Sequence, residues 1–146
     1  MGGRGSSSGE AGSGASGYQK TNDIPVMRYN RETSTYEVSK AKGYTTQKDG
    51  YTLNIQADEG TYRVSIGGMN VDGKTYHSLT EAKNAIDNGI HDYIQKHPEA
   101  FKSVVLAQNE ILSRIKKGEK ITTVTSNEIK QKWFEEVRRN PYRYIK

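Results

Sequence analysis

The most specific chemical pattern in this sequence is a possible phosphate-binding loop at residues 68–75. The residues that fit the spacing G-x-x-x-x-G-K-[ST] are Gly68, Gly73, Lys74 and Thr75. In a nucleotide site the loop amides surround the phosphates, the lysine reaches the terminal phosphates and the threonine binds magnesium. The helix that must begin at the lysine is predicted to begin only at Leu79. Asp72-Gly73 is better explained as a two-residue hairpin turn, so we do not predict nucleotide binding here.

Other residues that could do chemistry are few. The chain has three histidines and no cysteine. Asp87 and His91 have the i, i+4 spacing of a shared metal, but the same spacing makes an ordinary charged helix pair. The paired acids Asp58-Glu59 and Glu135-Glu136 fall in a turn and on a helix surface, which is a poor arrangement for acid–base catalysis. We therefore predict a protein that is not an enzyme, with no catalytic residue, no metal and no cofactor.

Positive charge is concentrated in the last third of the chain. Residues 100–146 hold 11 basic and 5 acidic side chains, whereas residues 18–99 hold 10 basic and 11 acidic. Lysine and arginine can neutralise phosphates, and interleaved aromatic rings can stack on unpaired bases. The predicted contacts for a partner or nucleic acid are Lys116, Lys117, Lys120, Lys130, Lys132, Arg138, Arg139, Tyr142, Arg143 and Tyr144. The alternative is a solvated helix surface with cations near helix C-termini, where they are favourable in any protein.

The elements that would position these residues begin with a sheet. Apolar and polar residues alternate over residues 51–57 and again over residues 61–66, which is typical of strands with one covered face. A weaker strand is expected at residues 36–38. A hairpin is expected between residues 69–71 and residues 74–77. Strands about ten residues apart favour an antiparallel meander of three to four strands.

Two or three helices are expected after the sheet. Ser78 and Glu81 form a capping box, and apolar residues then recur at helical spacing to residue 94. Asn88-Gly89 is expected to bend or split that helix. Pro98 suits the first turn of a second helix, whose apolar face includes Phe101, Val104 and Val105. A short β-prone stretch at residues 121–125 and a second capping box at residues 125–128 lead to the last helix. The fold class is therefore α+β.

The first residues of the chain cannot bury apolar surface. Seven of the first 17 residues are glycine and five are serine, which is typical of a flexible tail. We divide the chain into a disordered tail (1–20), a sheet with its covering helix (21–97) and a basic helical part (98–146). The last part packs on the same core or mediates an interface. No apolar run approaches the ~18–20 residues that cross a bilayer, so no membrane contact is expected.

Two resemblances add to this interpretation. The start MGGRGSSSG resembles small accessory proteins of tailed phages and prophages of Gram-positive bacteria, which implies a protein made in the host cytoplasm. Residues 50–90 more weakly resemble the three-stranded DNA-binding modules of integrase arms and AP2-type domains. That resemblance implies a sheet face that reads DNA through Thr52, Asn54, Gln56, Arg63, Ser65 and Lys74.

We therefore expect a phage-type binding protein that occupies a nucleic-acid or nucleoprotein surface. One concrete version is an inhibitor of a host nuclease-based defence such as CRISPR–Cas. The alternatives are a virion or head-morphogenesis accessory protein that contacts DNA or capsid partners, and a sequence-reading DNA-binding module. The expected partner is a nucleic acid, a nucleoprotein complex or an acidic protein surface, and a homodimer is possible.

Overall fold

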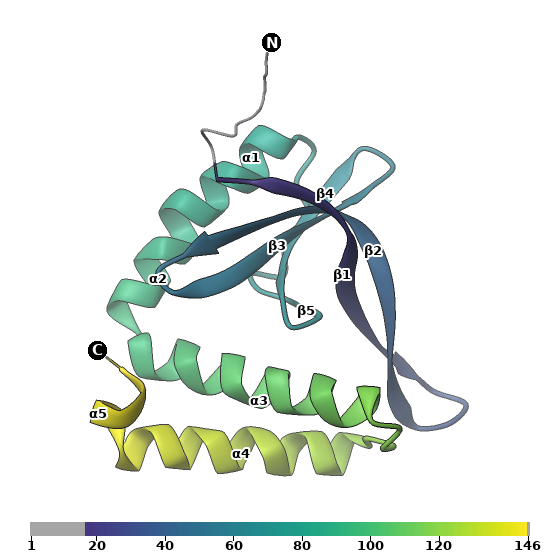
Figure 1. Ribbon diagram of the computed structural model, residues 1–146, viewed down its shortest axis with the longest axis vertical. Helices are drawn as coiled ribbons and strands as arrows, with labels where there is room; N and C mark the ends of the chain where they lie inside the picture. Colours follow the sequence, from purple (N-terminus) through teal and green to yellow (C-terminus); the bar gives the residue numbers. More distant parts are fainter. Residues whose placement is uncertain (1–16, 146) are drawn as a thin grey trace. The chain divides into compact units, whose positions relative to one another are not determined.

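The computed structural model describes residues 17–145, which form an antiparallel sheet followed by helices, as Figure 1 shows. This confirms the α+β class. The strands are hydrogen-bonded in chain order and are β1 (Gln19–Asn30), β2 (Thr35–Lys48), β3 (Tyr51–Asp58), β4 (Thr61–Ile66) and β5 (Met69–Asn70). The helical elements are α1 (Leu79–Ala85), the π-helical turn η1 (Ile86–Ile90), α2 (His91–Lys96), α3 (Pro98–Lys116), α4 (Thr123–Arg139) and α5 (Pro141–Tyr144).

The sheet is larger than the three to four strands that the sequence predicts, because β1 precedes them. Gln19 and Lys20, assigned above to the tail, are the first residues of β1. Residues 1–16 of the predicted tail lie outside the described residues. The expected strand at residues 36–38 is part of the longer β2.

The described residues divide into two compact units. The first contains residues 17–24, 40–66 and 70–91, and the second contains residues 25–39, 67–69 and 92–145. The predicted division lay at residues 97/98, but the helical unit also takes in parts of β1 and β2. The reason is packing, since Met27 and Tyr36 contact the buried cluster of the C-terminal helices.

In the first unit, β3 pairs with β2 and β4, and the apolar positions of the predicted alternation are buried, but so are Asn54 and Ser65 of the other set. Leu53 and Ile55 on β3 and Val64 on β4 are fully buried. The register places Ile55 opposite Tyr44 on one side and Val64 on the other. Apolar side chains on one face of neighbouring strands thus form this unit's core together with residues of α1 and η1.

The helical run from α1 through α2 begins at the predicted cap and changes its winding at Asn88-Gly89. The Ser78 hydroxyl accepts a hydrogen bond from the Glu81 amide (3.1 Å). The buried residues Ala82, Ile86, Ile90 and Ile94 recur every fourth position. In a helix of 3.6 residues per turn such a stripe drifts by about 40° per step. The wider turn of η1 offsets this drift, because its hydrogen bonds span five residues.

One predicted hairpin is wrong. Residues 74–77 form no strand beside β5. Instead Tyr76 pairs with Tyr62 of β4 through two backbone hydrogen bonds of 2.8 Å. The intervening amides are satisfied locally, since Gly73 donates to the Asn70 side chain (2.8 Å) and Lys74 donates to the Asp72 side chain (3.0 Å).

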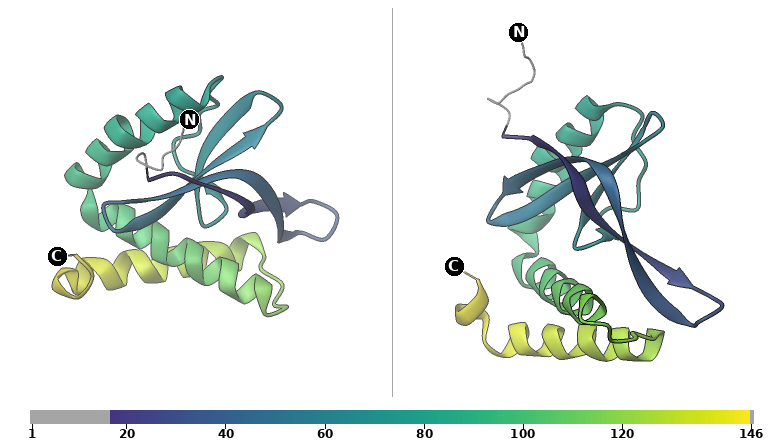
Figure 2. Two further views of the ribbon diagram at one scale, coloured as in Figure 1. Left: turned by 45° about the horizontal axis from the view of Figure 1, so that its top comes forward. Right: turned by 45° about the vertical axis from the view of Figure 1, so that its right-hand side comes forward.

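The second unit consists mainly of the antiparallel helices α3 and α4. Its buried cluster contains Ala107, Ile111, Ile121 and Ile129. The connection between the helices turns at Gly118 (φ +93°), a left-handed conformation that glycine adopts without strain. The hairpin half of β1 and β2 lies beside this connection in Figures 1 and 2, and the Tyr36 amide donates to the Ile121 carbonyl (2.9 Å).

The start of α4 differs from the expectation. The β-prone stretch at residues 121–125 forms no strand, and the helix cap is Thr122, whose hydroxyl accepts from the Thr125 amide (3.2 Å). The predicted capping box at residues 125–128 therefore lies inside the helix. Because Ile121 is fully buried in the core cluster, the chain must turn into the helix directly after it.

A substitution at Gly43 on β2 tests the packing of the first unit. A Cβ atom there would lie 1.9 Å from the Ile55 carbonyl oxygen, a backbone atom that cannot move aside. We expect Gly43→Ala to lower the free energy of unfolding by about 1–3 kcal/mol in urea denaturation. The matched control is Gly89→Ala in η1, where a Cβ meets nothing within 4 Å. Since glycine in a helix costs about 0.5–1 kcal/mol relative to alanine, this variant should be as stable as the parent or more so. Equal losses in both variants would contradict the close approach at Gly43.

Candidate functional site

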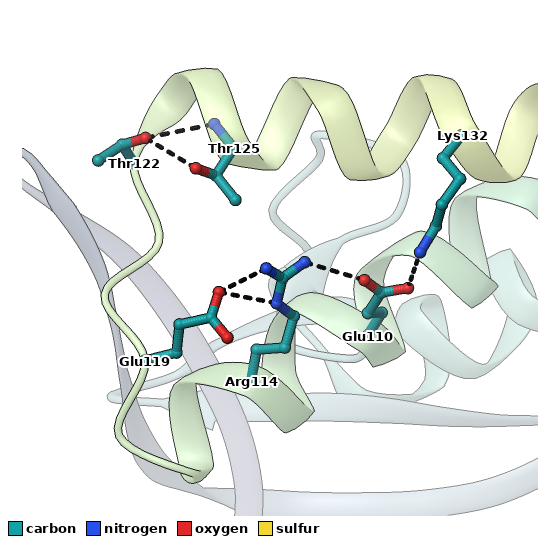
Figure 3. Close-up of polar contacts among 6 residues, drawn as sticks. All are labelled: Glu110, Arg114, Glu119, Thr122, Thr125 and Lys132. Carbon is teal, nitrogen blue, oxygen red and sulfur yellow. Dashed lines mark hydrogen bonds and ion pairs between the residues drawn. The ribbon is translucent and has the colours of Figure 1, made fainter.

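The carboxylate of Glu110 lies where α3 meets α4 and joins the two helices. It accepts hydrogen bonds from Arg114 Nη1 (3.0 Å), Lys132 Nζ (2.6 Å) and Trp133 Nε1 (2.8 Å). Arg114 also donates through Nε to Glu119 (2.8 Å), so charges of both signs alternate along this face, as Figure 3 shows. We call these residues the Glu110 network.

The network sets the ionisation of its acids. Burial raises the pKa of Glu110, but the hydrogen bonds from Lys132, Trp133 and Arg114 outweigh it, so the pKa lies below its ordinary value. The hydrogen bond from Arg114 likewise lowers the pKa of Glu119. Both carboxylates are therefore ionised at neutral pH and bind their cations.

Five of the ten predicted contact residues already form ion pairs or hydrogen bonds with glutamates of α3 or α4. Lys132 belongs to the Glu110 network. Glu135 Oε1 lies 3.7 Å from Arg138 and 3.4 Å from Arg139. Glu136 Oε2 lies 3.6 Å from Arg143 and accepts a hydrogen bond from the Tyr144 hydroxyl (2.9 Å). That hydrogen bond raises the pKa of Tyr144. These groups are already engaged, so they are poorer candidates for a partner.

Four predicted lysines have no carboxylate within ion-pair distance in the described part of the chain. Three of them, Lys116, Lys117 and Lys120, lie at the end of α3 and in the connection that follows, and all three are exposed. We call them the turn lysines. The fourth, Lys130, lies on α4. The predicted residues thus do not form one surface, because the 17 residues of α4 separate the turn lysines from Arg143 by about 25 Å.

An exposed aromatic residue is linked through Tyr36 to the connection that carries the turn lysines. Tyr29 of β1 is 43% exposed and packs edge-on against Tyr36 (centroids 5.1 Å apart). Tyr36 in turn is hydrogen-bonded to the residue after Lys120. The charge count could not find Tyr29, because it is 87 residues or more from the turn lysines in sequence.

A cleft between α3 and α4 is a second feature that the sequence did not predict. It has two hollows, of about 470 and 360 Å³, and Phe134 lines both. Val104, expected on the apolar face of its helix, is instead 43% exposed in the larger hollow, and Phe134 is 49% exposed. One signal was available, since two adjacent aromatic residues in a helix, Trp133 and Phe134, cannot share one stripe.

The sheet face that the DNA-binding resemblance implies is only partly accessible. Ser65 is fully buried and Asn54 is 8% exposed. The Arg63 side chain donates a hydrogen bond to Thr75 (3.4 Å), and Gln47 donates to Thr52 (2.7 Å). Only part of the implied set is accessible, so this surface is a weaker candidate than the turn lysines.

The remaining chemical patterns have structural explanations. The loop that fits the phosphate-binding pattern uses its Gly73 and Lys74 amides for its own side chains, and α1 begins at Leu79, as expected. Asp87 and His91 contact the turn between β2 and β3. His91 Nδ1 lies 2.7 Å from Asp49, and Asp87 lies 3.5 Å from Lys48. Residues 17–145 contain no group of three His, Asp or Glu side chains placed to hold a metal.

Comparison with known proteins adds no assignment. No protein family, no curated protein and no solved structure matches this chain. The nine residues that resemble phage accessory proteins lie outside the described residues. No helix within residues 17–145 is both long enough and apolar enough to cross a membrane.

The Glu110 network predicts a specific response to acid. Because the folded-state pKa of Glu110 is lowered, its contribution to stability is present above the ordinary pKa and is lost as pH falls through the folded pKa. We expect Glu110→Gln to be less stable by about 1–2 kcal/mol at pH 7, with a difference that shrinks below about pH 4. Urea denaturation at several pH values measures this difference. The control is Glu128→Gln, an exposed α4 residue without an ion pair in residues 17–145. A pH-independent difference for Glu110→Gln would argue against the network.

Proposed function

We propose that this chain is a non-enzymatic binding protein that contacts the phosphates of a nucleic acid or nucleoprotein through the turn lysines. The observation that carries the proposal is their lack of carboxylate partners within residues 17–145. Lys132, Arg138, Arg139 and Arg143, by contrast, each have such a partner. An unpaired ammonium group can bind a phosphate and release its counterion without first breaking an internal ion pair.

The position of the turn lysines supports the same proposal. Lys116, Lys117 and Lys120 lie within five consecutive residues on a connection fixed at both ends. Gly118 and the Thr122 cap define its turn, and Ile121 anchors it in the core. Three cations on a connection that is fixed at both ends lose less conformational entropy on binding than three cations on a flexible segment. A helix C-terminus also favours lysines in any protein, so an experiment must separate stability from binding.

The exposed ring of Tyr29 favours a single-stranded nucleic acid as the ligand. This ring packs on Tyr36, whose amide is hydrogen-bonded to Ile121 at the end of the connection that carries the turn lysines, so a base could stack on Tyr29 while the lysines bind neighbouring phosphates. Stacking of a base on an aromatic side chain contributes about 1–3 kcal/mol and needs no particular sequence.

The salt dependence of binding tests the turn lysines. We expect the parent protein to bind duplex DNA with a log–log salt slope of about −2.7, because three phosphate contacts contribute about −0.9 each. The triple variant Lys116→Gln, Lys117→Gln, Lys120→Gln should have a slope near zero, measured by fluorescence anisotropy. The control is Arg138→Gln with Arg139→Gln, which removes two cations that are paired with Glu135 and should keep the parent slope. Thermal unfolding of each variant reports any loss of stability. The same slope for both variants would falsify the assignment to the turn lysines.

A second measurement tests Tyr29. We expect Tyr29→Ala to weaken binding to a single-stranded oligonucleotide by about fivefold or more and to leave duplex binding unchanged. The matched control is Tyr142→Ala, which removes a ring that is 96% exposed at the opposite end of α4. Equal effects of the two substitutions on single-strand affinity would show that the Tyr29 ring has no special role.

A further inference from the structure

The α3–α4 cleft has the shape of a binding site for side chains. Its larger hollow is lined by Met69, Ser103, Val104, Ala107, Gln108, Asn127, Lys130, Gln131 and Phe134. Its volume of about 470 Å³ lies within the range of ligand pockets, and that of the smaller hollow is about 360 Å³. An exposed aromatic ring that lines both hollows is a feature of interaction hot spots. The cleft is therefore suited to hold two apolar side chains, one on each side of Phe134.

The spacing of the hollows matches a helix. Gln131 lines the larger hollow and Val137 lines the smaller one, and both belong to α4. Six residues along an α-helix cover about 9 Å, somewhat less than two turns. Apolar side chains at positions i and i+7 of a second helix are about 10 Å apart. A helix laid along the cleft can thus place one side chain in each hollow, which is the helix-in-groove mode of recognition.

The charged residues at the rim of the cleft favour a partner of one charge. Lys130 borders the larger hollow and has no ion pair within residues 17–145. Lys96 borders the smaller hollow, and its ion pair with Asp92 is an exposed contact of 3.6 Å, which contributes little. Glu99 is the one acidic residue that lines the described hollows. A positive rim around an apolar floor favours an acidic partner.

Other occupants fit less well. The first 16 residues of this chain contain Met1 as their only large apolar residue, so they offer little to fill the hollows. A second copy of the chain in a two-fold contact would bring the positive rim of the cleft against the same positive rim of its partner, and like charges repel. Nucleic acid would leave the apolar floor unused.

We propose that the α3–α4 cleft binds an acidic amphipathic helix of a partner protein, with large apolar side chains at positions i and i+7. This inference does not depend on the turn lysines, because Lys116, Lys117 and Lys120 do not line the cleft. The protein would then have two binding surfaces on one pair of helices, one for phosphates and one for a peptide.

Two synthetic peptides test the proposal. Both are helices of about 16 residues, long enough to fold in part, with leucines at positions i, i+4 and i+7. One carries glutamates beside the leucine stripe and the other carries lysines. We expect the acidic peptide to bind the full chain at least about tenfold more tightly by fluorescence anisotropy. In NMR spectra of the labelled chain it should shift the amide signals of the cleft residues and not those of the turn lysines.

Substitutions in the cleft locate the contact. Phe134→Ala should weaken binding of the acidic peptide by about tenfold or more, as expected for a hot-spot residue. Val104→Glu, on the opposite wall, should weaken it as well, and Lys130→Gln should weaken it by about two- to fivefold. The matched control is Val124→Ala, which truncates a 67% exposed apolar side chain of α4 that lines neither hollow, and should leave affinity unchanged. Thermal unfolding confirms that each variant is folded.

Several results would overturn the proposal. The first is equal binding of the basic and acidic peptides. Another is unchanged affinity in both Phe134→Ala and Val104→Glu. Self-association of the parent chain that Phe134→Ala abolishes would assign the cleft to a second copy. Shifts of the cleft residues on titration with an oligonucleotide would assign it to nucleic acid. Failure of the turn-lysine experiment alone would leave the peptide result intact, so the two proposals fail separately.

Discussion

The pairing of acids with cations decides which parts of the C-terminal helices are available to a partner. Glu110 and Glu119 hold Arg114 and Lys132, and Glu135 holds Arg138 and Arg139. Glu110 is the central group, because its three donors come from both α3 and α4 and a half-buried carboxylate without them would be costly. The positive charge that these acids do not pair is thereby confined to a few lysines at defined positions. These unpaired lysines define the candidate binding surface.

The two sides of the helix pair have different character as a consequence. On α4, positions 128, 132, 135, 136 and 139 lie on one side, and positions 127, 130, 131, 134 and 138 lie on the other. Lys132 of the first set pairs with Glu110 of α3, and Glu135 of the same set pairs with Arg139. The second set lines the cleft, where Phe134 and Lys130 are exposed. The Trp133–Phe134 doublet reflects this division, since Trp133 donates to Glu110 and packs on the core while Phe134 faces the cleft.

The sequence predicted those elements whose residues repeat with a clear period. The buried apolar positions of β3 and β4, the Ser78 cap and the start of α3 at Pro98 follow from local patterns, and the structure confirms them. Strand β1 was not predictable in this way, because most of its residues are polar and it contains Pro25, which cannot donate a backbone hydrogen bond. Its formation depends on residues distant in sequence, such as Gly43, whose missing side chain makes room for Ile24. The start of α4 was misplaced because Thr122 and Thr125 can each cap a helix, and burial of Ile121 decides between them.

Charge counting located the basic region but could not locate the binding surface within it. The pairs of Glu135 with Arg138 and Arg139 have i, i+3 and i, i+4 spacing and could have been deduced from the sequence. The contact between Glu110 and Lys132 joins residues 22 positions apart and required the structure. A lysine that is bound to a carboxylate must lose that partner before it binds a phosphate. Each internal ion pair therefore lowers the affinity for nucleic acid below the value that a charge count suggests. Binding to the turn lysines weakens with salt because it releases counterions, whereas burial of apolar side chains around Phe134 does not. Ionic strength therefore affects the two surfaces to different extents, since salt screens only the rim charges of the cleft and not its apolar floor.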